Sequence, residues 1–430
     1  MGKNNAFKFR IYPTKKEKEI MGEFFRTNKF IYNHLLAIEE NTNFILRMYG
    51  LNNDTPNKEL NKWKSKHSLW FNRFMASKYL TKLKDSGKYP FLSSFPSNAR
   101  DTVIKDLYEA FEKMKKGSGY PKFKNRKSND SYRVRYTNNM ILNITKFGNK
   151  FHKINLPSNI KKPLKNITIV IHNQYFLDNY TNFKFNSVTI SKNKSGQYFV
   201  SFQIQENIEK PEQKDINEET SIGIDLGIAK TITLSNGETL KSKENKINSY
   251  REHEADLKRL QKIISGKKKG SNKYNRILNK IRKLHTKISN IRKDIHHNLT
   301  HELVNLENID TFVLEDLNVK GMSKKAKPKQ SENGGYLPNG KKRKSGLNKS
   351  LLDVGLHSIK EKLIYKAKNL GKNVVLVDPK YTSQKCNNCG HTSKENRKTQ
   401  KSFICIACGH TENADLNASK NIKDKFFEKT

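Results

Sequence analysis

The stretch SIGIDLGIAK, residues 221–230, is the part of the chain that says most about its architecture. Its apolar run ends at Asp225, and a tight turn then leads into a second apolar run, TITL, at residues 231–234. A short apolar run bounded by turn residues is typical of a buried strand. We therefore predict a strand, a tight turn and a second strand, with an acidic residue at the end of the first strand.

Two further acids occur in comparable contexts. Glu315 follows the apolar run at residues 312–314, and Asp415 directly precedes a predicted helix. Phosphodiester hydrolysis with two divalent cations about 4 Å apart needs several carboxylates, and oxygen ligands suit Mg²⁺. Each acid also has a plain structural explanation: a turn former at Asp225, an N-cap at Asp415, and the solvent-facing end of a strand at Glu315, where Asp316 is equally acidic. The three acids are candidates for a two-metal site.

All four cysteines follow the spacing of a metal site. Cys386 and Cys389 form one C-x₂-C pair, Cys405 and Cys408 form another, and each pair is followed by Gly-His. Two such pairs at this separation are typical of a pair of zinc knuckles, and four thiolates make a closed, structural tetrahedral site. A redox pair and unligated cysteines are the alternatives. The pattern predicts one structural Zn²⁺, with the two neighbouring histidines outside the ligand set.

The charge of the chain indicates its class of partner. Lys and Arg total 84 against 41 Asp and Glu, which leaves a formal net charge of +43 over 430 residues. Such an excess opposes compaction unless a polyanion neutralises it, and proteins bind nucleic acids largely through the phosphates. There is no run of about 20 apolar residues to span a membrane and no apolar signal-peptide core. We expect a nucleic-acid-binding protein of the cytoplasm rather than a secreted, membrane-spanning or disulfide-rich one.

Hydrophobic periodicity divides the rest of the chain into blocks. Residues 14–115 carry apolar positions at helical spacing, and residues 131–205 alternate in the manner of strands. Residues 250–305 predict an antiparallel helical hairpin, because their isoleucines and leucines recur in steps of four and three. A further helix is predicted over residues 351–370, and a buried strand over residues 374–377.

A loop of alternating basic and aromatic residues separates the helical block from the strands. Its centre is YPKFK at residues 120–124. This mixture suits contact with phosphates combined with stacking on bases. We expect Tyr120, Lys122 and Lys124 to contact nucleic acid.

Together these motifs resemble those of a known family. GIDLG at residues 223–227 is similar to the first motif of a RuvC-type nuclease, and LEDLNVKGM at residues 314–322 to the second. The cysteine knuckles followed by ADLNA at residues 414–418 resemble its zinc module and third motif. With RIYPT at residues 10–14 and FIYN at residues 30–33, the chain resembles TnpB, the transposon-encoded family related to miniature type V CRISPR effectors, over nearly its whole length.

The resemblance implies a multidomain α+β fold, in which a β-barrel is interrupted by a helical domain and followed by a nuclease domain. The implied parts are a β-barrel wedge domain at residues 1–13 and 117–205, a helical recognition domain at residues 14–116, a linker at residues 206–220, an RNase H-like RuvC nuclease domain at residues 221–380 and 411–430, which contains the helical hairpin 250–305, and a zinc-binding module at residues 381–410.

The resemblance also implies an activity. It implies an RNA-guided DNA endonuclease in which Asp225, Glu315 and Asp415 hold two catalytic Mg²⁺ ions. Its implied partners are a guide RNA and a double-stranded DNA target with a short adjacent motif that the protein reads. We expect a monomer, in the cytoplasm of a bacterium or archaeon and associated with the nucleoid.

The residues that would read the adjacent motif are less well marked. The resemblance points to Ser94, Phe95, Asn98, Thr137 and Asn138, although Ser94 stands where relatives can carry a basic residue. The plain structural alternative is an N-cap at Ser94 and a core side chain at Phe95.

Other functions stay open at this point. A miniature type V CRISPR effector is the nearest alternative, and a CRISPR array or transposon ends beside the gene would separate the two. A nuclease-silent, RNA-guided DNA-binding repressor is a second alternative, which the intact set of acids argues against. A transposase that joins DNA strands is a third, and it would require a strand-transfer reaction.

Overall fold

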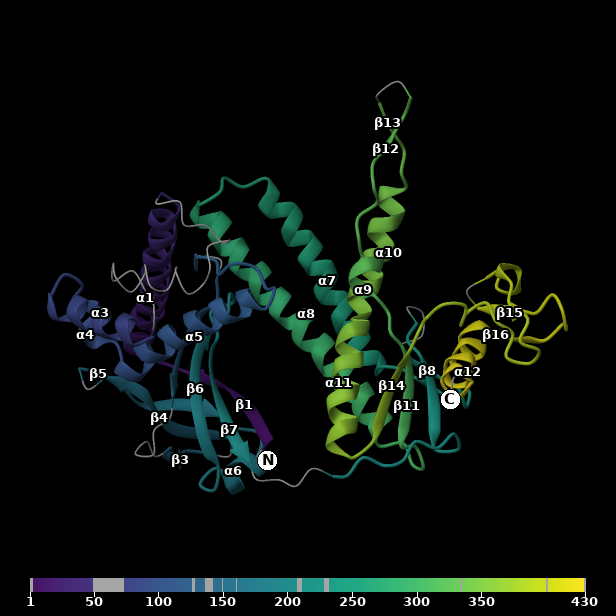
Figure 1. Cartoon of the computed structure of the whole chain (residues 1–430), viewed down its shortest axis with the longest axis horizontal. Helices are drawn as coiled ribbons and strands as arrows, with labels where there is room; N and C mark the ends of the chain where they lie inside the picture. Colours follow the sequence, from purple (N-terminus) through teal and green to yellow (C-terminus); the bar gives the residue numbers. More distant parts are fainter. Residues whose placement is uncertain are drawn as a thin grey trace. The chain divides into compact units, whose positions relative to one another are not determined.

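The computed structural model describes residues 3–48, 73–125, 128–135, 142–148, 150–159, 161–206, 211–227, 232–332, 335–399 and 401–428 (Figure 1). The chain divides into two compact units, Met1–Ile208 and Glu209–Thr430. Among the described residues, no helix is long and apolar enough to cross a membrane.

The first unit is built on a seven-stranded antiparallel sheet with β1 at its centre. β1 pairs with β7 on one side and β5 on the other, and its side chains Phe9 and Ile11 are buried. Register shifts in the β4–β5 and β6–β7 pairs help the sheet to curl. The order is β2-β6-β7-β1-β5-β4-β3, with β1 Lys3–Tyr12, β2 Asp130–Arg135, β3 Ile144–Lys146, β4 Phe151–Asn159, β5 Lys162–Val170, β6 Lys184–Lys192 and β7 Tyr198–Glu206.

The predicted β-barrel corresponds to this curled sheet. Within the described part of the chain, β2 and β3 are its two edges and no pairing joins them. Most of the connection between these strands, residues 136–141, lies outside the described residues. Closure into a barrel therefore stays a prediction.

Helices pack on this sheet through an aromatic cluster. The Phe24 ring centroid lies 5.8 Å from that of Phe95 and 5.4 Å from that of Tyr132, and all three side chains are buried. Thr14 caps the first helix: its hydroxyl accepts from the Glu17 N–H, and its own N–H donates to the Glu17 carboxylate. The helices are α1 Lys15–Met48, α3 Arg73–Asp85, α4 Phe91–Ser94, α5 Ser97–Lys115 and α6 Gln174–Asn179.

The second unit contains a five-stranded mixed sheet. β8, β11 and β14 run parallel to one another. β9 pairs antiparallel with β8, and β10 pairs antiparallel with β9. The continuous apolar runs seen in the sequence are these strands. β8 and β11 are buried on both faces. β14 is an edge strand in which Leu376 is 40% exposed, so the buried strand predicted over residues 374–377 is only partly buried. The order is β10-β9-β8-β11-β14, with β8 Ser221–Asp225, β9 Ile232–Leu234, β10 Thr239–Leu240, β11 Thr311–Glu315 and β14 Asn373–Val377.

Different helices cover the two faces of this sheet. Ile224 and Leu314 pack with Leu363 of α11 in one hydrophobic cluster that also includes side chains of α8, whereas Val313 packs with Ile422 of α12. Neighbouring residues of a strand point to opposite faces, so α12 lies on the face opposite α8 and α11. The bounds are α7 Glu244–Ser265, α8 Asn272–Val304, α9 Val319–Met322, α10 Lys341–Val354, α11 Leu356–Asn369 and α12 Ala414–Phe427.

The predicted helical hairpin is formed by α7 and α8 (Figure 1). The helix predicted over residues 351–370 is confirmed over most of this range, but it is not continuous, because Gly355 separates the end of α10 from the start of α11. This residue has a φ of 67°, and a Cβ there would lie 2.5 Å from the His296 ring. The remaining elements are the hairpin β12 Lys329–Gln330 and β13 Tyr336–Leu337, the 3₁₀ turn Lys394–Asn396, and the hairpin β15 Ser402–Ile404 and β16 Thr411–Asn413.

Candidate active site and metal centre

Two of the three candidate acids lie at the same edge of the second sheet. Asp225 is the last residue of β8 and Glu315 is the last residue of β11. These strands are parallel neighbours in a register that pairs Ile224 with Leu314, so the next residue on each strand is an acid. Both acids are partly buried, because each is the final residue of a strand whose other residues are buried.

The third acid reaches this edge on a helix. Asp415 is in the first turn of α12, where the Asn413 side chain caps the helix by accepting from the Asp415 N–H. α12 packs unusually close to β8 at Gly223, where a Cβ would lie 2.0 Å from the Ser419 carbonyl oxygen. Only glycine permits this approach. The GIDLG motif therefore supplies the acid Asp225 and, at Gly223, the space that lets α12 pack close enough to place Asp415 near it.

The charges of Glu315 and Asp415 both act on Asp225. Burial raises the pKa of Asp225 to about 7, and the charges of Glu315 and Asp415 act in the same direction. The Arg397 guanidinium and the Leu226 backbone N–H favour the ionised form and partly oppose this rise. Carboxylates that disfavour one another's ionisation form a site at which a divalent cation would be stabilised.

Glu315 and its neighbour Asp316 have different surroundings, which the sequence did not distinguish. Burial raises the pKa of Glu315, and the hydroxyl of buried Thr382 donates to its Oε1. The Asp316 side chain is 62% exposed and forms an ion pair with Lys360 at 2.9 Å. Glu315 is thus the residue that faces the cluster, and Asp316 lies outside it.

Arg397 is a site residue that the sequence reasoning missed. Its Nη2 donates to Asp415 Oδ1 at 3.1 Å, and its charge is also felt by Asp225 and Glu315. It lies between the two cysteine pairs, where the preceding Asn396 is buried and its side chain donates to the Gln384 and His391 carbonyls. No motif surrounds Arg397, so nothing in the sequence signals its position.

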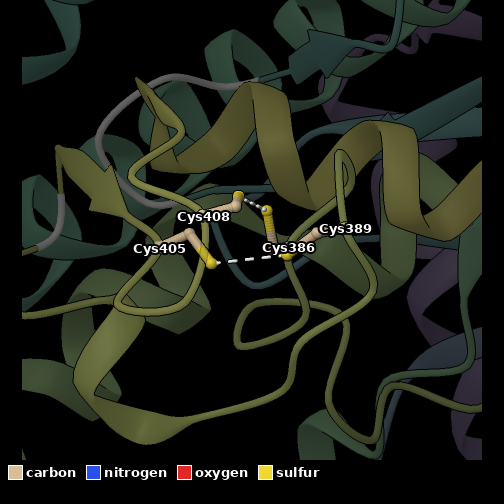
Figure 2. Close-up of side chains that lie close together, drawn as sticks. All are labelled: Cys386, Cys389, Cys405 and Cys408. Carbon is tan, nitrogen blue, oxygen red and sulfur yellow. Dashed lines mark hydrogen bonds between the residues drawn. The ribbon is translucent and has the colours of Figure 1, made fainter.

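The four cysteines come together as their spacing predicts (Figure 2). Their sulfur atoms all lie within 4.8 Å of one another, with Cys386 and Cys408 Sγ 3.8 Å apart and Cys389 and Cys405 Sγ 3.6 Å apart. A tetrahedron with metal–sulfur bonds of about 2.3 Å has edges of about 3.8 Å, so the donor set fits one ion. Among the described residues, this is the one group of potential ligands that is so tightly clustered.

Both knuckles use the same backbone turn. The Cys386 N–H donates to the His391 carbonyl, and the Cys405 N–H to the His410 carbonyl, each at 2.9 Å. The glycine in each turn has a φ above 70°, a conformation that a side chain disfavours. The repeated sequence Cys-x₂-Cys-Gly-His is therefore a repeated structure, and its histidines contribute backbone rather than ligand atoms to these turns.

The first knuckle is bound to α12, the helix that carries Asp415. The Asn417 side chain accepts from the Asn387 N–H at 3.0 Å and donates to the Lys385 carbonyl at 2.9 Å. Asn421, one turn further along, also donates to that carbonyl, at 2.7 Å. Both asparagines are buried. The cysteine module and the carboxylate cluster consequently share one supporting helix.

The candidate nucleic-acid contacts lie in the first unit, where some are exposed and some are not. Ser94 is buried and donates to Glu23, and Phe95 is a core side chain. Lys122 is exposed, Tyr120 is 39% exposed, and the Lys124 ammonium lies 4.0 Å from the centre of the Tyr32 ring. Nucleic-acid contact by these five residues stays a prediction.

Asn98 lines an open cavity of about 470 Å³. Arg73, Phe74 and Arg135 also line it, and the Phe74 side chain is 66% exposed. An amide, two guanidinium groups and an exposed ring are groups that contact bases and phosphates. Sequence reasoning singled out Asn98 but not its three neighbours. The other two predicted readers, Thr137 and Asn138, lie outside the described residues.

Three family models match the chain. Residues 201–326 match a model described as "Probable transposase", residues 357–422 match "Cas12f1-like, TNB domain", and residues 1–42 match "Helix-turn-helix domain". In the last range, the described structure consists of β1 and the long helix α1.

Curated relatives agree with these matches and are named as nucleases. The chain is 31% identical to a putative RNA-guided DNA endonuclease, InsQ, of Escherichia coli over 98% of this chain and 92% of that protein. It is 27% identical to the CRISPR-associated endodeoxyribonuclease Cas12f1 of Sulfoacidibacillus thermotolerans over 50% of this chain and 47% of that protein. The chain belongs to the TnpB family.

The fold has a counterpart among solved structures. A Cas12f1 chain from a complex with guide RNA and target DNA matches 98% of this chain and is itself 99% covered, with a TM-score of 0.54. The sequence identity is 12%. The mixed α/β architecture is therefore shared, although few residues are.

Proposed function

We propose that the protein is an RNA-guided DNA endonuclease that cleaves its target by metal-dependent phosphodiester hydrolysis. The observation that carries the proposal is the convergence of Asp225, Glu315 and Asp415 from two parallel strands and one helix onto one edge of the second sheet. Membership of a family whose relatives are named RNA-guided DNA endonucleases supports the type of reaction. The arrangement of sheet and acids supports an RNase H-like, RuvC-type nuclease domain.

The residues of this site suit a pair of divalent cations. Asp225, Glu315 and Asp415 would hold them, and Mg²⁺ is the hard cation that such oxygen ligands favour. Two bound ions would supply an activated water and stabilise the leaving oxygen. Arg397 forms an ion pair with Asp415, and its planar guanidinium suits a phosphate oxygen of the DNA. Its role would be to bind and orient the scissile phosphate.

The cysteine cluster has a structural role in this proposal. Four thiolates at tetrahedral spacing fit Zn²⁺ and leave no open position for a reaction. Hydrogen bonds of the Asn417 side chain connect the first cysteine knuckle to α12, the helix that carries Asp415. Zinc binding would therefore stabilise the supports of Arg397 and Asp415.

The partners would be a guide RNA and double-stranded DNA. A net charge of +43 requires extensive neutralisation by phosphate. The cavity beside Asn98 is our candidate for reading a short motif next to the target, and the basic and aromatic loop around Lys122 is our candidate for contact with the nucleic-acid backbone. We propose that the active particle contains one protein chain.

Cleavage by the purified ribonucleoprotein tests this function. RNA that co-purifies with the protein would be sequenced to identify the guide, and matched and mismatched duplexes would then be incubated with Mg²⁺. We expect cutting of the matched duplex only. If an Asp225→Asn ribonucleoprotein cut the matched duplex as fast as the wild type, the carboxylate cluster would not be the active site.

A strand-joining reaction is the second candidate, because residues 201–326 match a family model described as "Probable transposase". The same assay distinguishes the two functions. A transposase would join labelled DNA ends to a second duplex in the absence of guide RNA, whereas the proposed nuclease would leave only cleaved ends.

A further inference from the structure

Thr382 connects the cysteine-bearing segment to the carboxylate cluster. It is 3% exposed, and its hydroxyl donates to Glu315 Oε1 at 2.5 Å. A threonine hydroxyl has a single proton to donate. The Pro379 carbonyl, at 3.1 Å, would satisfy that proton within its own turn. The shorter contact to the carboxylate is therefore not required merely to satisfy a buried hydroxyl.

The backbone around Thr382 is held in an uncommon conformation. The preceding Tyr381 has a φ of 66°, which is rare for a residue with a side chain, and its own side chain is 63% exposed. Such conformations persist where the surrounding structure imposes them, and they concentrate at functional sites. The turn is thus shaped for something other than the packing of Tyr381.

α12 provides the surrounding constraint. Asn421, which is 2% exposed, donates to the Thr382 carbonyl at 2.9 Å and to the Lys385 carbonyl at 2.7 Å. Lys385 directly precedes the first cysteine of the cluster. The helix that carries Asp415 therefore also fixes the turn that carries Thr382, and two of the acids are positioned by one rigid element.

We propose that Thr382 is a positioning residue for Glu315: its hydroxyl occupies Oε1 and leaves Oε2 as the oxygen that would bind a cation. This role rests on the proposed function. Within the described part of the chain, no hydrogen-bond partner is assigned to Oε2. Groups that hydrogen-bond a metal-binding carboxylate typically change metal affinity or activity by about 10- to 100-fold when they are removed.

Three variants separate positioning from packing. Thr382→Val keeps the shape and removes the hydroxyl, whereas Thr382→Ser keeps the hydroxyl and removes a methyl group. Thr300→Val is the matched control, because Thr300 is buried in the same unit and its hydroxyl also joins two groups: it donates to the His296 carbonyl and accepts from the Lys366 ammonium, neither of which is an acid of the site. We expect Thr382→Val to reduce cleavage about 10- to 100-fold, with Thr382→Ser within about threefold of the wild type and Thr300→Val unchanged.

Mn²⁺ binding supplies a readout that does not depend on cleavage. Each ribonucleoprotein, prepared with the same guide RNA, would be titrated with Mn²⁺ by calorimetry, and an Asp225→Asn sample would define the binding that belongs to RNA and other sites. We expect the Asp225-dependent binding to weaken about 10-fold or more in Thr382→Val and to recover in Thr382→Ser. Target binding without divalent cations should be equal in all variants.

The outcomes distinguish this inference from the proposed function. Equal Mn²⁺ binding and equal cleavage by wild type and Thr382→Val would overturn the positioning role, as would a Thr382→Ser variant as impaired as Thr382→Val. Absence of any Asp225-dependent Mn²⁺ binding would also count against it. A wild-type ribonucleoprotein that binds Mn²⁺ through Asp225 but cuts no matched DNA would instead refute the proposed function, and the comparison of Mn²⁺ affinities would still decide the role of Thr382.

Discussion

The carboxylate cluster and the four-cysteine cluster lie in the same unit but are assembled in different ways. The cysteines come from residues 386–408 and meet through two copies of one short turn. Asp225 and Asp415 are 190 residues apart in the sequence, and they meet only because a strand and a helix pack in contact at Gly223. One cluster is thus a local structure, and the other depends on the whole unit.

This difference has consequences for energetics. A bound ion would stabilise the cysteine module directly, because four thiolates make a closed site. Burial and, to a lesser extent, the charges of Glu315 and Asp415 raise the pKa of Asp225, so the unit must supply the free energy that holds these carboxylates together. Substitutions in the two clusters should therefore affect stability and cleavage in different proportions.

Neutralising Asp225 should have the strongest effect. We expect Asp225→Asn to lower the rate constant of target cleavage about 10³-fold or more, because a cation ligand is lost. Zinc content and target binding should not change, since the cysteine module does not depend on this carboxylate. Single-turnover cleavage and elemental analysis of the same preparation measure both. A drop in zinc content would show that metal binding by the cysteine module depends on the carboxylate cluster.

Removing a cysteine should have a smaller effect on the chemistry and a larger one on stability. Cys405→Ser should release the metal and lower the melting temperature of the unit by roughly 6–12 °C, if about 3 kcal/mol of metal-binding free energy is lost. His391→Ala is the control, because this exposed histidine contributes only its backbone to the knuckle. A Cys405→Ser protein that melts like the wild type would argue that the cluster is not a structural metal site.

Arg397 tests the connection between the two clusters. It belongs to the cysteine-bearing segment but forms an ion pair with Asp415. We expect Arg397→Ala to lower cleavage about 10²-fold while zinc content stays at the wild-type level, with partial recovery in Arg397→Lys, which restores the charge but not the planar fork. Full activity of Arg397→Ala would mean that the ion pair serves only to compensate the charge of Asp415.

The pH dependence of stability should show the smallest effect. The pKa of Asp225 is raised from 3.8 to about 7 in the folded state, so the folded state binds its proton more tightly than the unfolded state does. The stability contributed by the protonated form is complete below about pH 4 and is lost as the pH rises through about 7. Without added Mg²⁺, the melting temperature of the wild type should therefore fall more steeply between pH 5 and pH 8 than that of Asp225→Asn. Parallel curves would contradict this.

The site could be predicted in part from the sequence because its acids end recognisable strands. An apolar run followed by an acid marks Asp225 and Glu315. The sequence also places Asp415 at the start of a helix, although the cap is Asn413 and Asp415 lies inside the first turn rather than before it. The local pattern did not separate Glu315 from Asp316, because both are acids at the end of the same apolar run, and only the family resemblance pointed to Glu315. The structure separates them by exposure and by their partners.

Arg397 and Gly355 show where sequence reasoning fails. Arg397 is one arginine among 84 basic residues, and only the fold of the cysteine module brings it to Asp415. The helical pattern of residues 351–370 continues through Gly355, where the His296 ring leaves no room for a side chain. In both cases the decisive contact joins residues that are far apart in the chain.

The sequence by itself determined the family, the cysteine cluster and the strands that end in acids, because these depend on spacing and periodicity within short segments. Tertiary structure alone decided how close the three acids lie, which basic residue joins them and which threonine fixes Glu315. The physical reason is that carboxylates repel one another and have no local preference to meet. Their proximity is imposed by the packing of α12 on β8 at Gly223, which no local pattern encodes.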